Sequence, residues 1–181
     1  MKKQALFIQG GGQGAHEADG ELVVYLQNAL GAEYDVLYPK MPNLEDPEYE
    51  PWKIQARKEL AALDGEVILV GHSLGGSVLL KYLSEETCEK SIAGLFIFAA
   101  PYWGAKDWQI DEFTLREDFS AKLPQIPRIF LYHSRDDEVV PVAHLGLYAE
   151  KLPQATVREL DGRGHLFNTG FPELVDDIKS L

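Results

Sequence analysis

Val67-Ile68-Leu69-Val70-Gly71-His72-Ser73-Leu74-Gly75-Gly76 is the most informative stretch of this sequence, because it joins an unbroken apolar run to a Gly-x-Ser-x-Gly motif. The apolar run predicts a strand covered on both faces, and the apolar segment Leu74–Leu83 predicts a buried helix. A serine between such a strand and helix lies at the apex of a tight turn, where glycines two residues to either side remove Cβ atoms that would collide. The motif therefore predicts that the Ser73 hydroxyl projects from one edge of a sheet.

This turn gives Ser73 the position of a nucleophile. The Leu74 N–H would lie at the amino end of the following helix, where it can donate to a developing oxyanion. The structural alternative is a serine that caps the helix on a glycine-rich turn. We favour the nucleophile, because a strand before the serine and a helix after it are the context that the motif requires.

Short apolar runs continue in both directions from this stretch. Six runs are predicted to be strands, namely Ala5–Ile8, Val36–Tyr38, Val67–Val70, Leu95–Ala99, Ile129–Tyr132 and Thr156–Leu160. Five segments are predicted to be helices, namely Glu21–Leu30, Trp52–Leu63, Leu74–Leu83, Val142–Leu152 and Pro172–Leu181. Their alternation predicts an α/β fold with about six mostly parallel strands and helices on both faces of the sheet.

The chain is expected to form a single domain over residues 1–181, because it shows no internal repeat, low-complexity tract or linker. Two segments interrupt the alternation of strands and helices. Met41–Pro51 is rich in proline and acidic residues and predicts a surface loop. Pro101–Pro127 is aromatic but has no clear strand. We expect it to form a small cap over the strand ends, since long irregular segments in compact domains are often functional.

Composition narrows the class of protein. Hydrophobic residues make up 45% of the chain and charged residues 25%, as in ordinary globular proteins. The formal net charge of −12 disfavours nucleic acid and anionic membranes as partners. A single cysteine, Cys88, excludes an intramolecular disulfide, and the short apolar run at the start is unlike a signal peptide, so we expect a cytoplasmic protein. The dispersed histidines predict no metal and no cofactor, and the oligomeric state is left open.

A serine hydroxyl needs a base to take its proton, and two histidines follow the candidate acids. His144 falls in the first turn of the helix after Pro141, and we expect it to be solvated. His165 ends the glycine-rich stretch Asp161-Gly162-Arg163-Gly164-His165, which can bend over the sheet edge between the last strand and the last helix. Since the chain order in this architecture is serine, acid, histidine, His165 is the predicted general base.

The acid that orients this histidine is expected just after the strand Ile129–Tyr132. The loop there reads His133-Ser134-Arg135-Asp136-Asp137-Glu138-Val139-Val140-Pro141 and holds three adjacent carboxylates. The acid must fix the imidazole tautomer and stabilise the imidazolium. Spacing alone does not choose between Asp136 and Asp137, whereas Glu138 better fits an exposed acidic turn before a helix.

Together, the serine, acid and histidine segments resemble those of α/β-hydrolases. The small size is similar to that of the YdeN-like hydrolases, related to retinoblastoma-binding-protein-type serine hydrolases, and in many such enzymes the acid loop reads H-G-x-x-D-x-x-V-P. The matching positions here are His133, Asp137, Val140 and Pro141. The resemblance therefore implies that Asp137 is the acid. The chain departs from the pattern at Gln9, where many relatives have histidine, and at Ser134, where many have glycine.

The first glycine loop, Gly10-Gly11-Gly12-Gln13-Gly14, follows the strand Ala5–Ile8. The resemblance implies that this loop supplies a second oxyanion donor, from Gly11 or alternatively Gly12, and the structural alternative is a plain glycine turn. The loop also reads as the dinucleotide fingerprint G-x-G-x-x-A through Ala15. That fingerprint wants an acid at the end of the second strand, whereas Asp35 precedes it, so a dinucleotide-binding oxidoreductase is disfavoured.

The aromatic residues of the expected cap complete the predicted site. Trp103, Trp108 and Phe113 are candidates to line an acyl pocket with Gly12, and ordinary packing is the alternative. His72 is expected to pack under the turn. The resemblance implies a carboxylesterase-like serine hydrolase that forms an acyl-enzyme from a small ester or amide. The alternative from another class is a non-catalytic, protein-binding member of the same fold.

Overall fold

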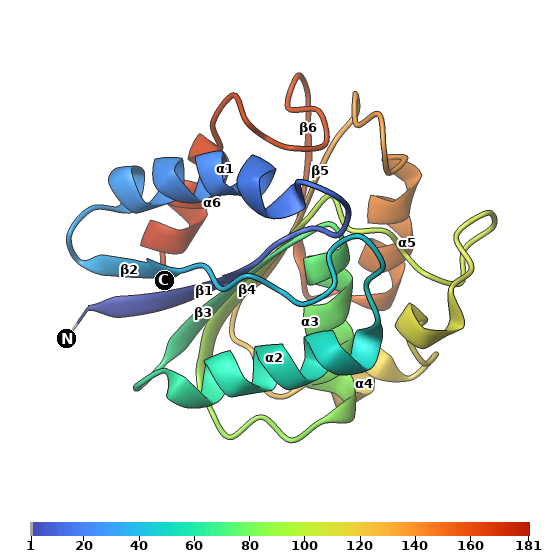
Figure 1. Ribbon diagram of the computed structural model, residues 1–181, viewed down its shortest axis with the longest axis horizontal. Helices are drawn as coiled ribbons and strands as arrows, with labels where there is room; N and C mark the ends of the chain where they lie inside the picture. Colours follow the sequence, from blue (N-terminus) through green and yellow to red (C-terminus); the bar gives the residue numbers. More distant parts are fainter. Residues whose placement is uncertain (1) are drawn as a thin grey trace.

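The computed structural model describes residues 2–181, which form a six-stranded sheet with helices on both sides (Figure 1). The strands are β1 (Lys3–Ile8), β2 (Tyr34–Leu37), β3 (Val67–His72), β4 (Ile92–Phe98), β5 (Ile129–Ser134) and β6 (Thr156–Leu160). Their order across the sheet is β2-β1-β3-β4-β5-β6, and all five pairings are parallel. The carboxyl ends of all six strands therefore lie at one edge.

Helices α1 (Ala15–Leu30) and α6 (Pro172–Lys179) cover one face, and α2 (Tyr49–Ala62), α3 (Leu74–Glu85) and α5 (Ala143–Lys151) cover the other (Figure 1). Among residues 2–181, none of the helices is both long enough and apolar enough to cross a bilayer. Strand alternation explains the two-sided cover. On β1, Leu6 and Ile8 join the core under α2 and α3, whereas Ala5 and Phe7 join the core under α1 and α6. An unbroken apolar strand is thus needed to fill both cores.

The predicted α/β class, with parallel strands and helices on both faces, is confirmed. The predicted bounds differ mainly at the starts of elements: α1 begins at Ala15 rather than Glu21, because its first turn is polar and carries no apolar period. The strand β6 is less completely covered than the central strands. This strand lies at the edge of the sheet, and its Thr156, Val157 and Glu159 are exposed.

The strand order brings two loops together. β1 lies between β2 and β3, so the glycine loop that follows β1 and the turn that follows β3 are neighbours at the carboxyl edge. In open α/β sheets, this point, where the strand order reverses, is where ligands bind. The fold therefore places Gly11 and Ser73 at the same crevice.

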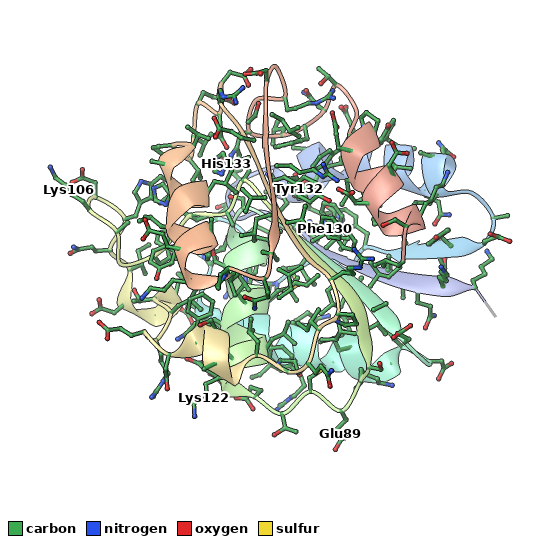
Figure 2. The ribbon with its side chains drawn as sticks, turned by 180° about the vertical axis from the view of Figure 1, so that it is seen from behind. Glu89, Lys106, Lys122, Phe130, Tyr132 and His133 are labelled. Atoms are coloured by element: carbon green, nitrogen blue, oxygen red, sulfur yellow. The ribbon has the colours of Figure 1, made fainter. Side chains whose placement is uncertain are left out.

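The aromatic segment 101–127 divides into two parts. The first contains a bridge between Ala105 and Trp108 and the 3-10 turn η1 (Asp111–Phe113). The second contains α4 (Phe119–Lys122), which packs beside α3 with Phe119 fully buried. In Figure 2, Lys106 and Lys122 mark the outer rim of this segment, and His133 lies beyond Phe130 and Tyr132 along β5. Residues of the first part border the cavity described below.

Candidate active site

Ser73 occupies the sharp turn between β3 and α3 in a backbone conformation that is rare for serine. Its φ is 50° and its ψ is −122°, a strain that costs about 1–3 kcal/mol and persists only where the surrounding structure imposes it. The glycines on either side of Ser73 show how closely the surrounding structure packs against this turn. A Cβ on Gly71 would lie 2.6 Å from Gly76 Cα, and a Cβ on Gly75 would collide with the Ile8 carbonyl oxygen. The turn can pack this tightly only with glycine at both positions.

Three loops bring the predicted serine, histidine and Asp137 together. His165 Nε2 lies 3.2 Å from Ser73 Oγ, and His165 Nδ1 lies 2.9 Å from Asp137 Oδ2 and 3.0 Å from Oδ1. The serine follows β3, the aspartate follows β5, and the histidine lies between β6 and α6. The contacts form one continuous line of hydrogen bonds from the carboxylate to the hydroxyl.

The Asp137 carboxylate is completely buried and fully hydrogen-bonded. Its Oδ1 accepts the N–H groups of Val139 and Val140, each at 2.8 Å, and its Oδ2 lies 3.0 Å from His133 Nε2. Burial alone would raise the pKa of Asp137. The hydrogen bonds from His133 and His165 outweigh burial and hold this pKa well below its ordinary value. The group therefore stays ionised beside the imidazole.

Asp136 points away from the imidazole and binds the loop that carries it. Its Oδ1 accepts the N–H groups of Gly162 (3.0 Å) and Gly164 (3.3 Å) and the hydroxyl of Ser134. The hydrogen bond from Ser134 lowers the pKa of Asp136. The two neighbouring aspartates thus divide between the side chain and the backbone of the histidine loop.

Ser134 and Glu138 add two more contacts to that loop. The buried Ser134 Oγ accepts the Arg163 N–H at 3.0 Å, and Glu138 Oε2 accepts the His165 N–H at 3.2 Å. A glycine at position 134 has no side chain and could not make this link. Ser134 therefore ties the acid loop to the histidine loop.

The expectation that His144 is solvated is wrong. Only 5% of this residue is exposed, and its Nδ1 accepts the Tyr102 N–H at 2.8 Å, while the Trp108 ring lies edge-on to it at 5.1 Å. Burial lowers the pKa of His144. The ring is buried because it packs against segment 101–127, and this histidine anchors the start of that segment through the Tyr102 N–H.

The N–H group of Gly11 in the glycine loop lies free at the crevice beside Ser73. The Gly10 N–H donates to Asp19 at 2.9 Å and the Gly12 N–H donates to the Leu44 carbonyl at 2.7 Å. Within residues 2–181, no group accepts the Gly11 N–H. A Cβ on Gly11 would lie 2.8 Å from Leu74 Cδ2. The loop and the first residue of α3 are therefore in close contact beside the serine.

A cavity of about 360 Å³ opens at Ser73. It is lined by Gly11, Asp46, Pro47, Ser73, Leu74, Pro101, Trp103, Trp108, Ile110, Glu112, Phe113, Val139 and Val140. Three predicted pocket residues, Trp103, Trp108 and Phe113, are in this set, and Gly12 is not. The lining is mainly apolar, and both of its charged residues are acidic.

Sequence reasoning missed several residues of this region. The loop Met41–Pro51 was expected only to be a surface loop, yet Asp46 and Pro47 line the cavity. The sequence identifies His133 only by its match to the H-G-x-x-D-x-x-V-P pattern, whereas in the structure its Nε2 lies 3.0 Å from Asp137 Oδ2. The one signal that could have drawn attention to the loop was its length, since long loops often border sites.

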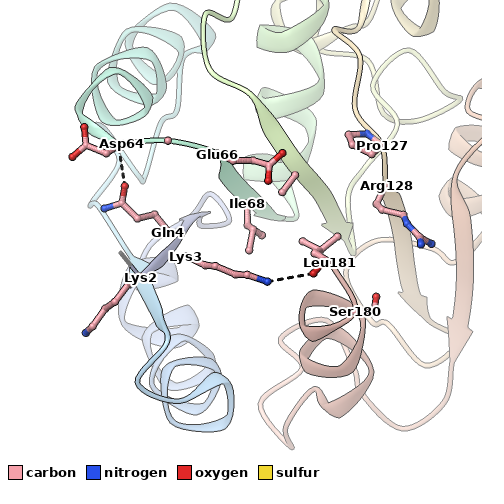
Figure 3. A pocket seen from close by; sticks show the side chains of 12 residues that line it. Lys2, Lys3, Gln4, Asp64, Glu66, Ile68, Pro127, Arg128, Ser180 and Leu181 are labelled. Atoms are coloured by element: carbon pink, nitrogen blue, oxygen red, sulfur yellow. Dashed lines mark hydrogen bonds between the residues drawn. The ribbon is translucent and has the colours of Figure 1, made fainter.

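A second cavity, of about 600 Å³, lies at the opposite, amino-terminal edge of the sheet (Figure 3). Lys3 Nζ donates to the Leu181 carbonyl across it and the Asp64 N–H donates to the Gln4 side chain. No histidine is among its 12 lining residues. Within residues 2–181, no group of three or more His, Cys, Asp or Glu side chains is placed to hold a metal ion. Ser73, whose hydroxyl oxygen lies 3.2 Å from His165 Nε2, lines the smaller cavity and not this one.

Similar proteins share this architecture over nearly their whole length. The protein YdeN of Bacillus subtilis (strain 168) is 26% identical over 148 residues, which are 81% of this chain and 77% of YdeN. The crystal structure of the B. subtilis ydeN gene product matches with a TM-score of 0.77 at 23% identity, covering 99% of this chain and 98% of that one. The serine hydrolase CCSP0084 from Cycloclasticus zankles matches with a TM-score of 0.77 at 15% identity, covering 100% and 89%.

A family model described as serine hydrolase matches residues 24–176, a range that contains Ser73, Asp137 and His165. This match argues against the dinucleotide-binding alternative. The chain belongs to the serine hydrolase family and has the α/β-hydrolase fold of its YdeN-like relatives.

Proposed function

We propose that this protein hydrolyses small carboxylic esters or amides through an acyl-enzyme on Ser73. The observation that carries the proposal is the line of hydrogen bonds from Asp137 through His165 to Ser73, with contacts of 2.9 and 3.2 Å. The ionised carboxylate accepts the Nδ1–H of His165, which leaves the Nε2 lone pair facing the serine hydroxyl. This is the tautomer that a general base needs.

The reaction proceeds in two acyl transfers. Ser73 Oγ attacks the carbonyl carbon while His165 Nε2 takes the hydroxyl proton, and the tetrahedral intermediate then expels the alcohol or amine, which receives that proton. Water repeats the sequence on the acyl-enzyme and releases the carboxylic acid. Asp137 remains ionised throughout and stabilises the imidazolium in each step.

Two backbone donors stabilise the oxyanion in this scheme. The Leu74 N–H is the first of α3 and has no partner inside the helix, so it points toward the attacked carbonyl with the helix dipole behind it. The unpartnered Gly11 N–H is the second donor, and its neighbour Gly12 is occupied by Leu44. Removing one such donor typically costs about 10²–10³ in kcat.

The cavity favours an uncharged, apolar acyl or leaving group. Trp103, Trp108 and Phe113 supply flat apolar walls, whereas Asp46 and Glu112 would repel a substrate carboxylate. A series of nitrophenyl esters tests this preference. We expect kcat/KM to be higher for a neutral acyl chain than for a chain of the same length that ends in a carboxylate, and Glu112→Gln should narrow the difference.

A serine-directed fluorophosphonate probe tests the proposed function most directly. The wild-type protein should be labelled at Ser73 and should hydrolyse a simple ester. Ser73→Ala should abolish labelling and lower kcat by about 10³–10⁶-fold while leaving the fold intact. Ser91→Ala, which changes an exposed serine outside the cavity, is the matched control and should retain both activities.

The same experiment addresses the non-catalytic alternative. A folded wild-type protein that neither reacts with the probe nor hydrolyses any ester of the series would favour a binding protein that keeps the hydrolase fold. Ser73→Ala retaining more than a tenth of wild-type turnover would instead show that another residue is the nucleophile.

A further inference from the structure

A second histidine–aspartate pair lies beneath the turn that carries the serine. His72, the residue before Ser73, places its Nδ1 2.7 Å from Asp19 Oδ2 on α1 and its Nε2 2.9 Å from the carbonyl oxygen of His165. Only 2% of His72 and 1% of Asp19 is exposed. None of these contacts involves the Ser73 hydroxyl, the His165 ring or the Asp137 carboxylate.

The partners of His72 fix its protonation state. A carbonyl oxygen can only accept, and so can an ionised carboxylate, so both ring nitrogens must carry a proton. Burial alone would lower the pKa of His72, but the charge and hydrogen bond of Asp19 raise it. Burial likewise would raise the pKa of Asp19, but His72 and the Gly10 N–H lower it. The two shifts agree on an imidazolium paired with a carboxylate.

This ion pair contacts three segments of the proposed site, namely the glycine loop, the serine turn and the histidine loop. Asp19 Oδ2 also accepts the Gly10 N–H at 2.9 Å, next to the oxyanion donor of Gly11. His72 Nε2–H holds the backbone of His165, whose ring lies 4.9 Å from the His72 ring. His72 itself immediately precedes the nucleophile. One buried pair thus joins the glycine loop, the serine turn and the histidine loop.

We propose that His72 and Asp19 are positioning residues for the hydrolysis proposed above, fixing the oxyanion loop and the backbone of the general base relative to Ser73. The inference rests on that proposed function, because it assigns the pair a role in the rate of acylation. A displacement of reacting groups by about 1 Å can lower a rate by about 10²-fold, so rigid support of three loops has a measurable effect.

The charges around the pair come from several elements. His72 faces Asp19 on α1, the His165 ring before α6 and the Asp137 carboxylate after β5, and its other face stacks on Phe98 of β4 at 4.7 Å. Asp19 also faces Tyr38. Burial raises the pKa of the Tyr38 hydroxyl, and the negative charge of Asp19 raises it further. The carboxylates of Asp19 and Asp137 therefore favour the charged form of His72, and a protonated His165 disfavours it.

Two substitutions separate the contacts of the pair. His72→Asn places an amide where Nδ1 lies, so it retains a donor toward Asp19 and loses the one toward the His165 carbonyl. Asp19→Asn retains an acceptor but removes the charge. Asp177→Asn is the matched control, because Asp177 is another buried carboxylate, bound to Tyr132 and Arg158 in the core under α6. Each variant is assayed well below its Tm, with rates normalised to folded protein.

We expect His72→Asn and Asp19→Asn to lower kcat and the rate of fluorophosphonate labelling by the same factor, about 10- to 100-fold, with KM changed less than about threefold. Asp177→Asn should lower only Tm. Folded His72→Asn and Asp19→Asn proteins that keep kcat within about twofold of wild type would overturn the inference and leave the proposed function standing. A wild-type protein that does not react at Ser73 overturns both.

The charge state has its own readout. Nitrogen NMR of histidine-labelled protein at about pH 8, where an ordinary histidine is neutral, should show both His72 nitrogens protonated in the wild type and one in Asp19→Asn. A neutral His72 in the wild type would contradict the pairing on which the inference depends.

Discussion

The two histidine–aspartate pairs differ in what the second ring nitrogen faces. Both histidines are nearly buried, with 7% of His165 and 2% of His72 exposed. Each ring binds a buried carboxylate through Nδ1. His165 Nε2 faces the Ser73 hydroxyl, which can give up a proton, whereas His72 Nε2 faces a carbonyl oxygen, which cannot. The group that faces Nε2, rather than burial, therefore distinguishes the proposed proton-transferring histidine from the fixed one.

The largest expected effect is the loss of the transferring histidine. His165→Ala should lower kcat for a simple ester by about 10³–10⁶-fold, against about 10- to 100-fold for His72→Asn. The double variant His165→Ala/Ser73→Ala should be hardly worse than either single variant, because the two residues act as a unit. Steady-state kinetics on purified proteins measures all of these. Equal losses for the two histidines would break the comparison.

Replacing the two aspartates, Asp137 and Asp19, is expected to have smaller effects on kcat that again differ between the two pairs. Asp137→Asn should lower kcat by up to about 10⁴-fold, because the amide can favour the wrong tautomer of His165. Asp19→Asn should cost far less, since His72 transfers no proton. The kcat of each variant, with circular dichroism to verify folding, provides the measurement. A larger loss for Asp19→Asn would mean that proton transfer runs through the buried pair.

The contact between Asp137 and His165 could be predicted from the sequence, and the contact between Asp19 and His72 could not. Ser73 is identified by a local sequence motif. His165 is identified by the chain order of serine, acid and histidine in an architecture that the alternation of strands and helices indicates. The choice of Asp137 needed the family pattern. The role of Asp136 depends on Gly162, 26 residues away, and no spacing rule connects two loops at that distance.

The pair of Asp19 and His72 could not be predicted for a related reason. Asp19 and His72 are 53 residues apart on α1 and β3. The sequence contained a hint, since an aspartate on the buried face of a helix requires a partner. The apolar period places the start of this helix at Glu21, two residues after Asp19, and so leaves this aspartate outside it. Correct placement of the polar first turn would have put this carboxylate against the sheet.

The next prediction separates the neighbours Asp136 and Asp137. Asp136→Asn should lower kcat by less than about tenfold, because the amide oxygen can still accept the N–H groups of Gly162 and Gly164. Asp136→Ala removes those acceptors and should cost more, through a loosened histidine loop. A loss for Asp136→Asn that exceeds the loss for Asp137→Asn, in folded proteins assayed with the same ester, would move the orienting acid to Asp136.

The smallest expected effect is on stability in acid, and it tests whether Asp137 is ionised in the folded protein. The folded-state pKa values of Asp19 and Asp137 lie below the ordinary value of 3.8. Each ionised group therefore contributes stability that is present above about pH 4 and is lost as the pH falls through its folded-state pKa.

Thermal unfolding should show Tm falling as the pH is lowered below 4. Asp137→Asn should flatten the fall by about 2–4 °C, the Tm equivalent of about 1 kcal/mol in a chain of this size. Asp35→Asn, which changes an exposed aspartate on β2, should keep the wild-type slope. If Asp137→Asn also keeps that slope, its carboxylate is not the buried, hydrogen-bonded anion that the comparison requires.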